Sequence, residues 1–131
     1  MNKRNLLTLT AIGEAAIGIF LLILPAAVCS ILLGVSYPSP EAELMSRFAG
    51  AALVAIGVAC WLARGDHSSS GQRGLLVGVF IYDIAAATLL AYAALVRDMI
   101  GIALWPAVAI HAALATWCVA CLRGDRAAGD A

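Results

Sequence analysis

Four long apolar stretches constrain this sequence more than any other feature. A helix that crosses a lipid bilayer needs about 20 mostly apolar residues, and each stretch is close to that length. The chain is 63% hydrophobic and 12% charged, whereas soluble domains carry about 45–50% apolar and about 25% charged residues. A water-soluble fold of 131 residues could not bury so much apolar surface. We therefore predict one all-α membrane domain over residues 1–131, with helices at about 6–33, 42–64, 74–96 and 102–122.

Proline and polar residues mark the expected helix ends. The first helix is expected to continue past Pro25 to Leu33. The segment Tyr37–Pro40 is a predicted turn, in which Ser39 caps the following helix and the proline after it occupies the first helical position. Residues 124–131 are expected to form a disordered tail.

Basic residues predict the orientation of the chain. If the N-terminus is cytoplasmic, the cytoplasmic side holds six basic residues: Lys3, Arg4, Arg64, Arg73, Arg123 and Arg126. Only Arg47 and Arg97 then lie outside, which agrees with the positive-inside rule. We predict an antiparallel four-helix transmembrane bundle with both termini inside. The first apolar run is too long for a secretory signal, whose core has about 7–15 residues, so we expect it to remain uncleaved.

The net charge and the small residues of the chain indicate which kinds of partner to expect. The formal net charge is zero and no basic run is present, so nucleic-acid binding is excluded. The expected partner is the lipid bilayer. Gly74 and Gly78 form a small-xxx-small pattern that could pair two copies of the chain, or join it to a larger membrane complex. A lipophilic small molecule is the remaining expected partner.

Three ionisable residues fall inside the expected spans. Glu14 and Asp83 lie eight and nine residues from the cytoplasmic ends of their stretches, about 12–14 Å deep at 1.5 Å per residue. His111 lies about 16 Å from the same side by the same rule. A charged acid at such depth costs about 2.5–3.5 kcal/mol on insertion scales. All three have small neighbours on their own helix faces, which predicts that they face other helices.

Two interpretations of this cluster remain open. In the first, an acid bonds to Thr10, Tyr82 or His111, and this hydrogen bond holds the helices of the bundle together. In the second, the cluster binds or moves a proton, a cation or a polar head group, because two facing carboxylates in a low dielectric should not both ionise. The sequence disfavours metal binding, since no close ligand spacing such as Glu-x-x-His occurs. We therefore expect no metal site.

Arg47 lies near the outer end of the second expected helix. Glu43 precedes it by one helical turn, so an interfacial ion pair between them is expected. A clamp at the outer mouth for an anionic ligand or head group is the alternative.

Cys118 and Cys121 form a C-x-x-C pattern near the cytoplasmic end, where thiols stay reduced, and we expect them to pack as small apolar residues.

The two halves of the chain can be aligned. Glu14 then matches Asp83, and Gly50 matches His111. Duplication would give a parallel repeat, whereas chance similarity between alanine- and leucine-rich helices is the alternative.

Short motifs in both halves of the first hairpin resemble a known group. Gly13-Glu14 with Gly18 and Pro25, and the segment Arg47–Gly50, are similar to motifs of DoxX-like proteins, a group of small bacterial inner-membrane proteins. The resemblance covers most of the chain. It implies a multi-pass protein of the bacterial inner (plasma) membrane, with links to quinone-linked oxidation or respiratory assembly, and carries over no residue role.

A second resemblance concerns Glu14. Small multidrug resistance exporters also have four helices and an essential glutamate in the first. They lack a second acid like Asp83, and this chain lacks their aromatic-rich cage.

Three functions follow as hypotheses. The first is a binding or accessory subunit whose Glu14–Asp83–His111 cluster holds a proton or a lipophilic ligand. The second is a proton-coupled small-molecule transporter. The third is an intramembrane isomerase or quinone-linked oxidoreductase, with His111 or Asp83 as general acid–base. No motif identifies a cofactor or a reaction, so whether the chain is an enzyme stays open.

Overall fold

The described part of the protein is entirely helical. The computed structural model describes the backbone over residues 2–35, 39–66 and 69–129, and side chains within those ranges as far as residue 124. Its helices are α1 (Lys3–Ile23), α2 (Pro25–Leu33), α3 (Pro40–Ala63), α4 (Ser70–Val96) and α5 (Leu104–Gly129). All but α2 are long and apolar enough to cross a membrane. The all-α prediction and the four apolar helices are therefore confirmed.

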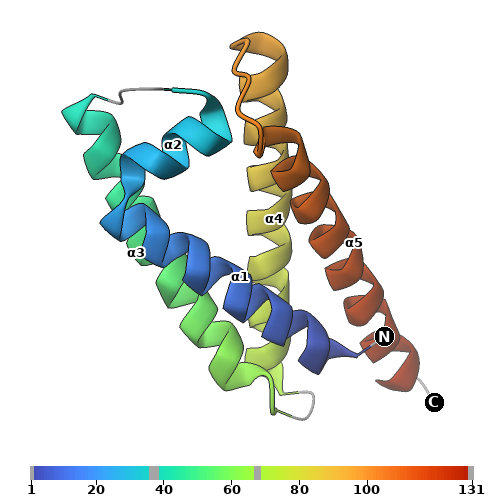
Figure 1. The fold of residues 1–131 in the computed structure, drawn as a ribbon. Helices are drawn as coiled ribbons and strands as arrows, with labels where there is room; N and C mark the ends of the chain where they lie inside the picture. The colour runs from blue at the N-terminus through green and yellow to red at the C-terminus, as the bar shows by residue number, and fades with distance from the viewer. Residues whose placement is uncertain (1, 36–38, 67–68, 130–131) are drawn as a thin grey trace.

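The first expected helix is divided into two at Leu24. Proline has no N–H to donate, and it disfavours the α conformation in the residue before it. Leu24 accordingly adopts φ −130° and ψ 54°, and Pro25 begins α2. Figure 1 shows α2 turning away from the line of α1. The chain thus forms two helices where we expected one to continue to Leu33.

Side-chain caps determine where α3 and α4 begin. Ser39 Oγ accepts a hydrogen bond from Ala42 N at 3.3 Å, which confirms the expected cap of α3. The residues Tyr37 and Pro38 of the expected turn lie outside the described residues. Helix α4 begins at Ser70 rather than at 74, because Ser69 Oγ accepts from Gln72 N at 3.1 Å.

The last helix also differs from the expected bounds. It continues to Gly129 rather than ending at 122, through part of the segment 124–131 where we expected a tail. This segment contains arginine and several alanines, which are strong helix formers, and no proline.

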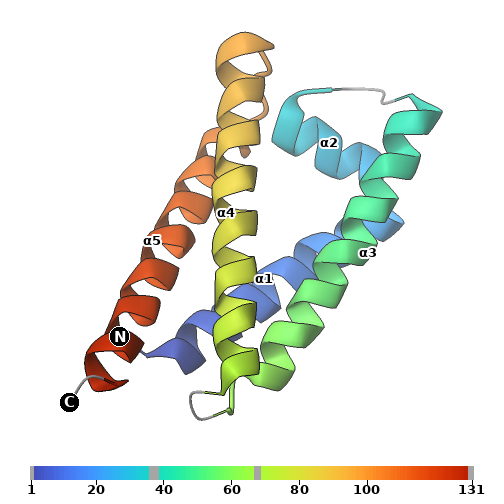
Figure 2. The same ribbon diagram turned by 180° about the vertical axis from the view of Figure 1, so that it is seen from behind.

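The long helices associate mainly as two pairs, α1 with α3 and α4 with α5. Both views of the ribbon show these pairs side by side (Figures 1 and 2). In the first pair, Gly18 and Gly50 face each other so closely that an added Cβ on Gly18 would lie 2.6 Å from the Gly50 carbonyl oxygen. Glycine at both positions therefore lets these two backbones approach.

Buried apolar residues gather where the two pairs meet. They come from α1, α3, α4 and α5 and are Leu6, Leu7, Ala11, Cys60, Leu76, Val79, Leu114, Cys118 and Cys121. Many large apolar side chains point outward instead, among them Phe20, Leu62 and Leu89. Such a surface suits contact with lipid better than contact with water.

Candidate functional site

The centre of the candidate site is an acid–imidazole pair between α4 and α5. Asp83 Oδ1 lies 2.8 Å from His111 Nδ1. The Asp83 side chain is fully buried, whereas the His111 side chain is 16% exposed. An isolated buried carboxylate is costly, and the imidazole supplies a hydrogen-bond partner. The pair therefore links α4 to α5 and leaves a small part of the His111 side chain exposed.

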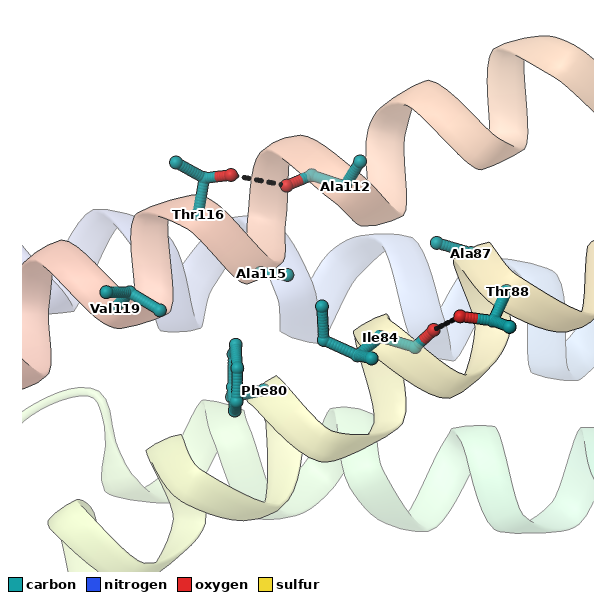
Figure 3. A pocket seen from close by; sticks show the side chains of 8 residues that line it. All are labelled: Phe80, Ile84, Ala87, Thr88, Ala112, Ala115, Thr116 and Val119. Carbon is teal, nitrogen blue, oxygen red and sulfur yellow. Dashed lines mark hydrogen bonds between the residues drawn. The ribbon is translucent and has the colours of Figure 1, made fainter. Parts of the chain in front are cut away.

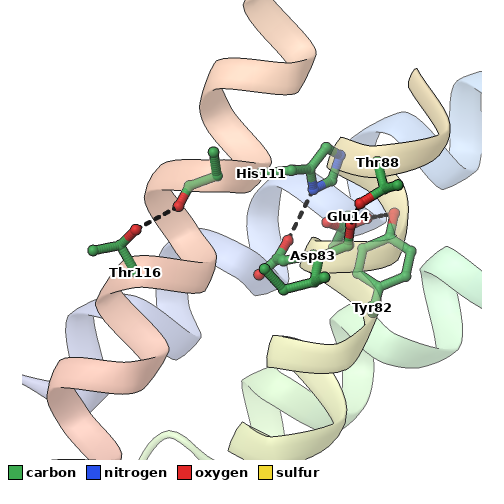
Figure 4. Close-up of polar contacts among 8 residues, drawn as sticks. Glu14, Tyr82, Asp83, Thr88, His111 and Thr116 are labelled. Atoms are coloured by element: carbon green, nitrogen blue, oxygen red, sulfur yellow. Dashed lines mark hydrogen bonds and ion pairs between the residues drawn. The ribbon is translucent and has the colours of Figure 1, made fainter. Parts of the chain in front are cut away.

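Helix α1 contributes Glu14 to the same place. Its side chain is only 6% exposed, and Tyr82 Oη donates a hydrogen bond to Glu14 Oε2 at 3.2 Å. The Tyr82 ring in turn meets the His111 ring edge-on, with centroids 5.6 Å apart and an interplanar angle of 83°. Tyr82 thus contacts both the glutamate and the histidine, and Figure 4 shows these side chains converging.

The three titratable groups meet at one point. One ligand atom from each of Glu14, Asp83 and His111 lies within 4.8 Å of the other two. The groups come from α1, α4 and α5, so packing of the two helix pairs against each other creates the site. Asp83 Oδ2 is buried and has no hydrogen-bond partner within the described residues. The cluster therefore combines two acids, one imidazole and an unsatisfied buried oxygen.

Thr10 lies one helical turn before Glu14 and is also buried. Its Oγ1 has no hydrogen-bond partner in the part of the chain that the structure describes. Of the three alternative partners considered for the acids, Tyr82 and His111 each bond to one acid, whereas Thr10 bonds to neither.

Arg47 contacts α1 in place of the expected pair with Glu43. Its Nη1 donates to the backbone oxygen of Leu22, and no ion pair joins it to Glu43 among the described residues. Leu22 is in the last turn of α1, where carbonyls lose their helical donors, and Pro25 adds no donor beyond the break. The arginine therefore caps the C-terminal end of α1. Sequence reasoning missed this role because α1 was expected to continue.

Gln72 was missed for a similar reason. It is buried, and its Nε2 donates to the carbonyl oxygens of Ala63 at 3.0 Å and Asp66 at 2.9 Å. These bonds fasten the end of α3 to the start of α4. A glutamine three residues after a serine able to cap a helix, Ser69, was the available signal.

The four cysteines are buried thiols. Cys60, Cys118 and Cys121 belong to the apolar core described above. Cys29 Sγ lies 3.4 Å from Ser46 Oγ, between α2 and α3. Their burial agrees with the packing interpretation of the C-x-x-C pattern.

An apolar groove of about 360 Å³ lies between α4 and α5, lined by Phe80, Ile84, Ala87, Thr88, Ala112, Ala115, Thr116 and Val119. Figure 3 shows its two threonines turned back to their own helices. Thr88 Oγ1 donates to Ile84 O and Thr116 Oγ1 to Ala112 O, each at 2.8 Å. The hydroxyl hydrogens are therefore used within the helices, and the groove offers a ligand mainly apolar contact.

Comparisons with known proteins found no match for this chain. No family model matches the chain, and neither a curated protein nor a solved structure matches it significantly. Function must therefore be argued from the site.

Proposed function

We propose that the chain is a small multi-pass protein of a bacterial inner membrane, and that it acts as a binding or accessory subunit. In this proposal α1, α3, α4 and α5 cross the bilayer as an antiparallel bundle with both termini in the cytoplasm. The distribution of basic residues supports the orientation. The length and apolar composition of the four helices support the crossing.

The binding site is the cluster of Glu14, Asp83 and His111 with Tyr82. One observation carries this assignment: three titratable groups from three separate helices meet within 4.8 Å in the middle of apolar helices. Ionisable side chains within a span are expensive and generally mark a functional site. The cluster has the donors and acceptors to hold a proton or the polar head of a lipophilic molecule, and the partial exposure of the His111 side chain gives access.

The competing interpretation is that the cluster only holds the helices together. The two interpretations differ in what an apolar replacement would do. Buried ionic groups replaced together by apolar residues of similar volume are often neutral or stabilising by about 1–4 kcal/mol. A cluster retained for binding should behave in this way, whereas a cluster that is the main link between the helix pairs should not.

The test is a combined variant, Glu14→Met with Asp83→Leu and His111→Leu, in purified full-length protein. We expect its free energy of unfolding in mixed micelles to equal or exceed that of the wild type. Asp83→Leu alone should destabilise the protein by about 1–3 kcal/mol, because it leaves His111 Nδ1 without its hydrogen-bond partner. Loss of several kcal/mol in the combined variant would show that the cluster is structural and would overturn the proposal.

A further inference from the structure

We infer that the Glu14–Asp83–His111 cluster binds a divalent first-row transition-metal ion. This inference rests on the proposed function and names the ligand class of the same site. It begins from the ligand set: two carboxylate oxygens and one imidazole nitrogen, each within 4.8 Å of the others. Metal–ligand bonds to such atoms are about 2.0–2.2 Å long, so ligand atoms in a tetrahedral site lie about 3.4 Å apart. The three groups would therefore have to close by up to about 1.4 Å around an ion.

The unsatisfied oxygen of Asp83 points to a missing partner. Asp83 is fully buried, and its Oδ1 is occupied by His111 while its Oδ2 has no partner in the described chain. A buried carboxylate oxygen without a partner loses its hydration and gains no hydrogen bond in exchange, which costs about 1–3 kcal/mol or more. A cation beside Asp83 would satisfy this oxygen, and the neighbouring Glu14 supplies a second one.

The charge of the cluster also suits a divalent ion. Glu14 and Asp83 bring two carboxylates to one place inside apolar helices, where like charges repel strongly and solvation is lost. Bound as carboxylates, they would carry two negative charges that a divalent ion neutralises. Metal binding would release whatever protons the ligands hold into the medium. A divalent ion would thus allow both groups to bind as carboxylates without leaving a net charge on the cluster.

Contacts around the cluster resemble those that orient metal ligands. Tyr82 Oη donates to Glu14 Oε2 at 3.2 Å, and its ring packs edge-on against that of His111. Hydrogen bonds to the ligands fix their direction and tune the metal. Tyr82 would therefore act as a positioning residue for both ligands.

The donor atoms select the class of ion. Imidazole suits zinc, iron, copper and nickel, whereas calcium and magnesium prefer oxygen ligands in larger number. No cysteine belongs to the three-residue group within the described residues, which disfavours ions that need thiolate ligands. Three protein ligands leave at least one coordination position open. The site thus fits an ion such as Zn²⁺ or Co²⁺ that can also bind an exogenous ligand.

The experiment uses the full-length protein in detergent, stripped with a chelator and dialysed. Zn²⁺ is titrated by calorimetry, and Co²⁺ by its visible absorption. We expect one ion per chain, and a loss of affinity of at least about ten-fold in each of Glu14→Gln, Asp83→Asn and His111→Gln. Tyr82→Phe should keep the 1:1 stoichiometry but weaken binding by about 10–100-fold, as removal of a supporting hydrogen bond does.

Two controls make the result decisive. Glu43→Gln removes a carboxylate outside the cluster and should not change the affinity. A variant with Cys60, Cys118 and Cys121 all replaced by alanine should also bind normally, and circular dichroism must show each variant helical. Absence of 1:1 binding in the wild type, or binding that depends on the thiols and not on the cluster, would overturn the inference. If the wild type binds no ion but the combined apolar variant is as stable as the wild type, the binding-site proposal stands and only the ligand class is wrong.

Discussion

A single methyl group added at Gly18 should separate the two helices that pack most closely. The Cβ of Gly18→Ala would lie 2.6 Å from the Gly50 carbonyl oxygen and 2.9 Å from both Cγ2 and the backbone nitrogen of Val54. Backbone atoms cannot rotate away as a flexible side chain can. Because carbon–oxygen contacts are normally about 3.3 Å or longer, α1 and α3 must move apart by roughly 0.7 Å.

The expected cost follows from that movement. A gap of about 0.5–1 Å removes a quarter to a half of the dispersion energy of a contact. Within lipid, van der Waals packing is a principal force between helices, since the apolar solvent gives little hydrophobic drive. Helix α1 has its largest contact with α3, so the loss is spread along the whole pair. We expect Gly18→Ala to lower the free energy of unfolding by about 1–3 kcal/mol, the usual range for overpacking.

The measurement is unfolding of the purified protein by dodecyl sulfate in mixed micelles, followed by circular dichroism and tryptophan fluorescence. Gly13→Ala is the matched control, because it adds the same methyl group in the same helix where nothing lies within 4 Å. We expect the control to be neutral or slightly stabilising, since alanine favours helix more than glycine does. Equal stability of the two variants would refute the close approach of α1 and α3.

Three further predictions use the same unfolding assay or a chemical probe. Arg47→Met should cost about 1–3 kcal/mol because it leaves the Leu22 carbonyl without its donor, and an unchanged midpoint would contradict the capping role. Gln72→Met should cost a similar amount and speed proteolysis of the α3–α4 connection, because two carbonyls lose their donor; full resistance to protease would contradict this. The cysteines should react slowly with a maleimide until the protein unfolds, since all four are buried, and stoichiometric labelling of the folded protein would contradict their placement.

Local sequence signals predicted a helix end correctly where a single residue determines it. Ser39 and the proline after it mark the start of α3, because the serine accepts a bond that the first helical turn leaves unmade. The same chemistry at Ser69 escaped notice, since several serines stand together and periodicity does not choose among them. The break before Pro25 was not predicted, because the sequence alone does not say whether a proline kinks a helix or ends it.

The similar heights of the three ionisable residues along their helices could also be predicted, because helix rise per residue is fixed, and the three groups do meet. What could not be predicted is which groups bond to each other. Asp83 pairs with His111 and Glu14 with Tyr82, and these choices depend on the rotation of each helix about its axis. The spacing rule that disfavoured metal applies to ligands on one helix. It does not bear on this cluster, because the three titratable groups come from three helices.

The alignment of the two halves, which chance similarity would also give, marks where the two helix pairs differ. Glu14 and Asp83 occupy matching positions in the first helix of each pair, and Gly50 matches His111 in the second. In the α1–α3 pair, Gly50 has no side chain and allows the backbone of α1 to approach. In the α4–α5 pair, the matching position carries an imidazole that bonds to the acid of its own pair. Glu14 therefore has no such partner within its own pair and bonds across the interface to Tyr82. Histidine at the position aligned with Gly50 thus places one imidazole beside both acids, at the interface of the two helix pairs.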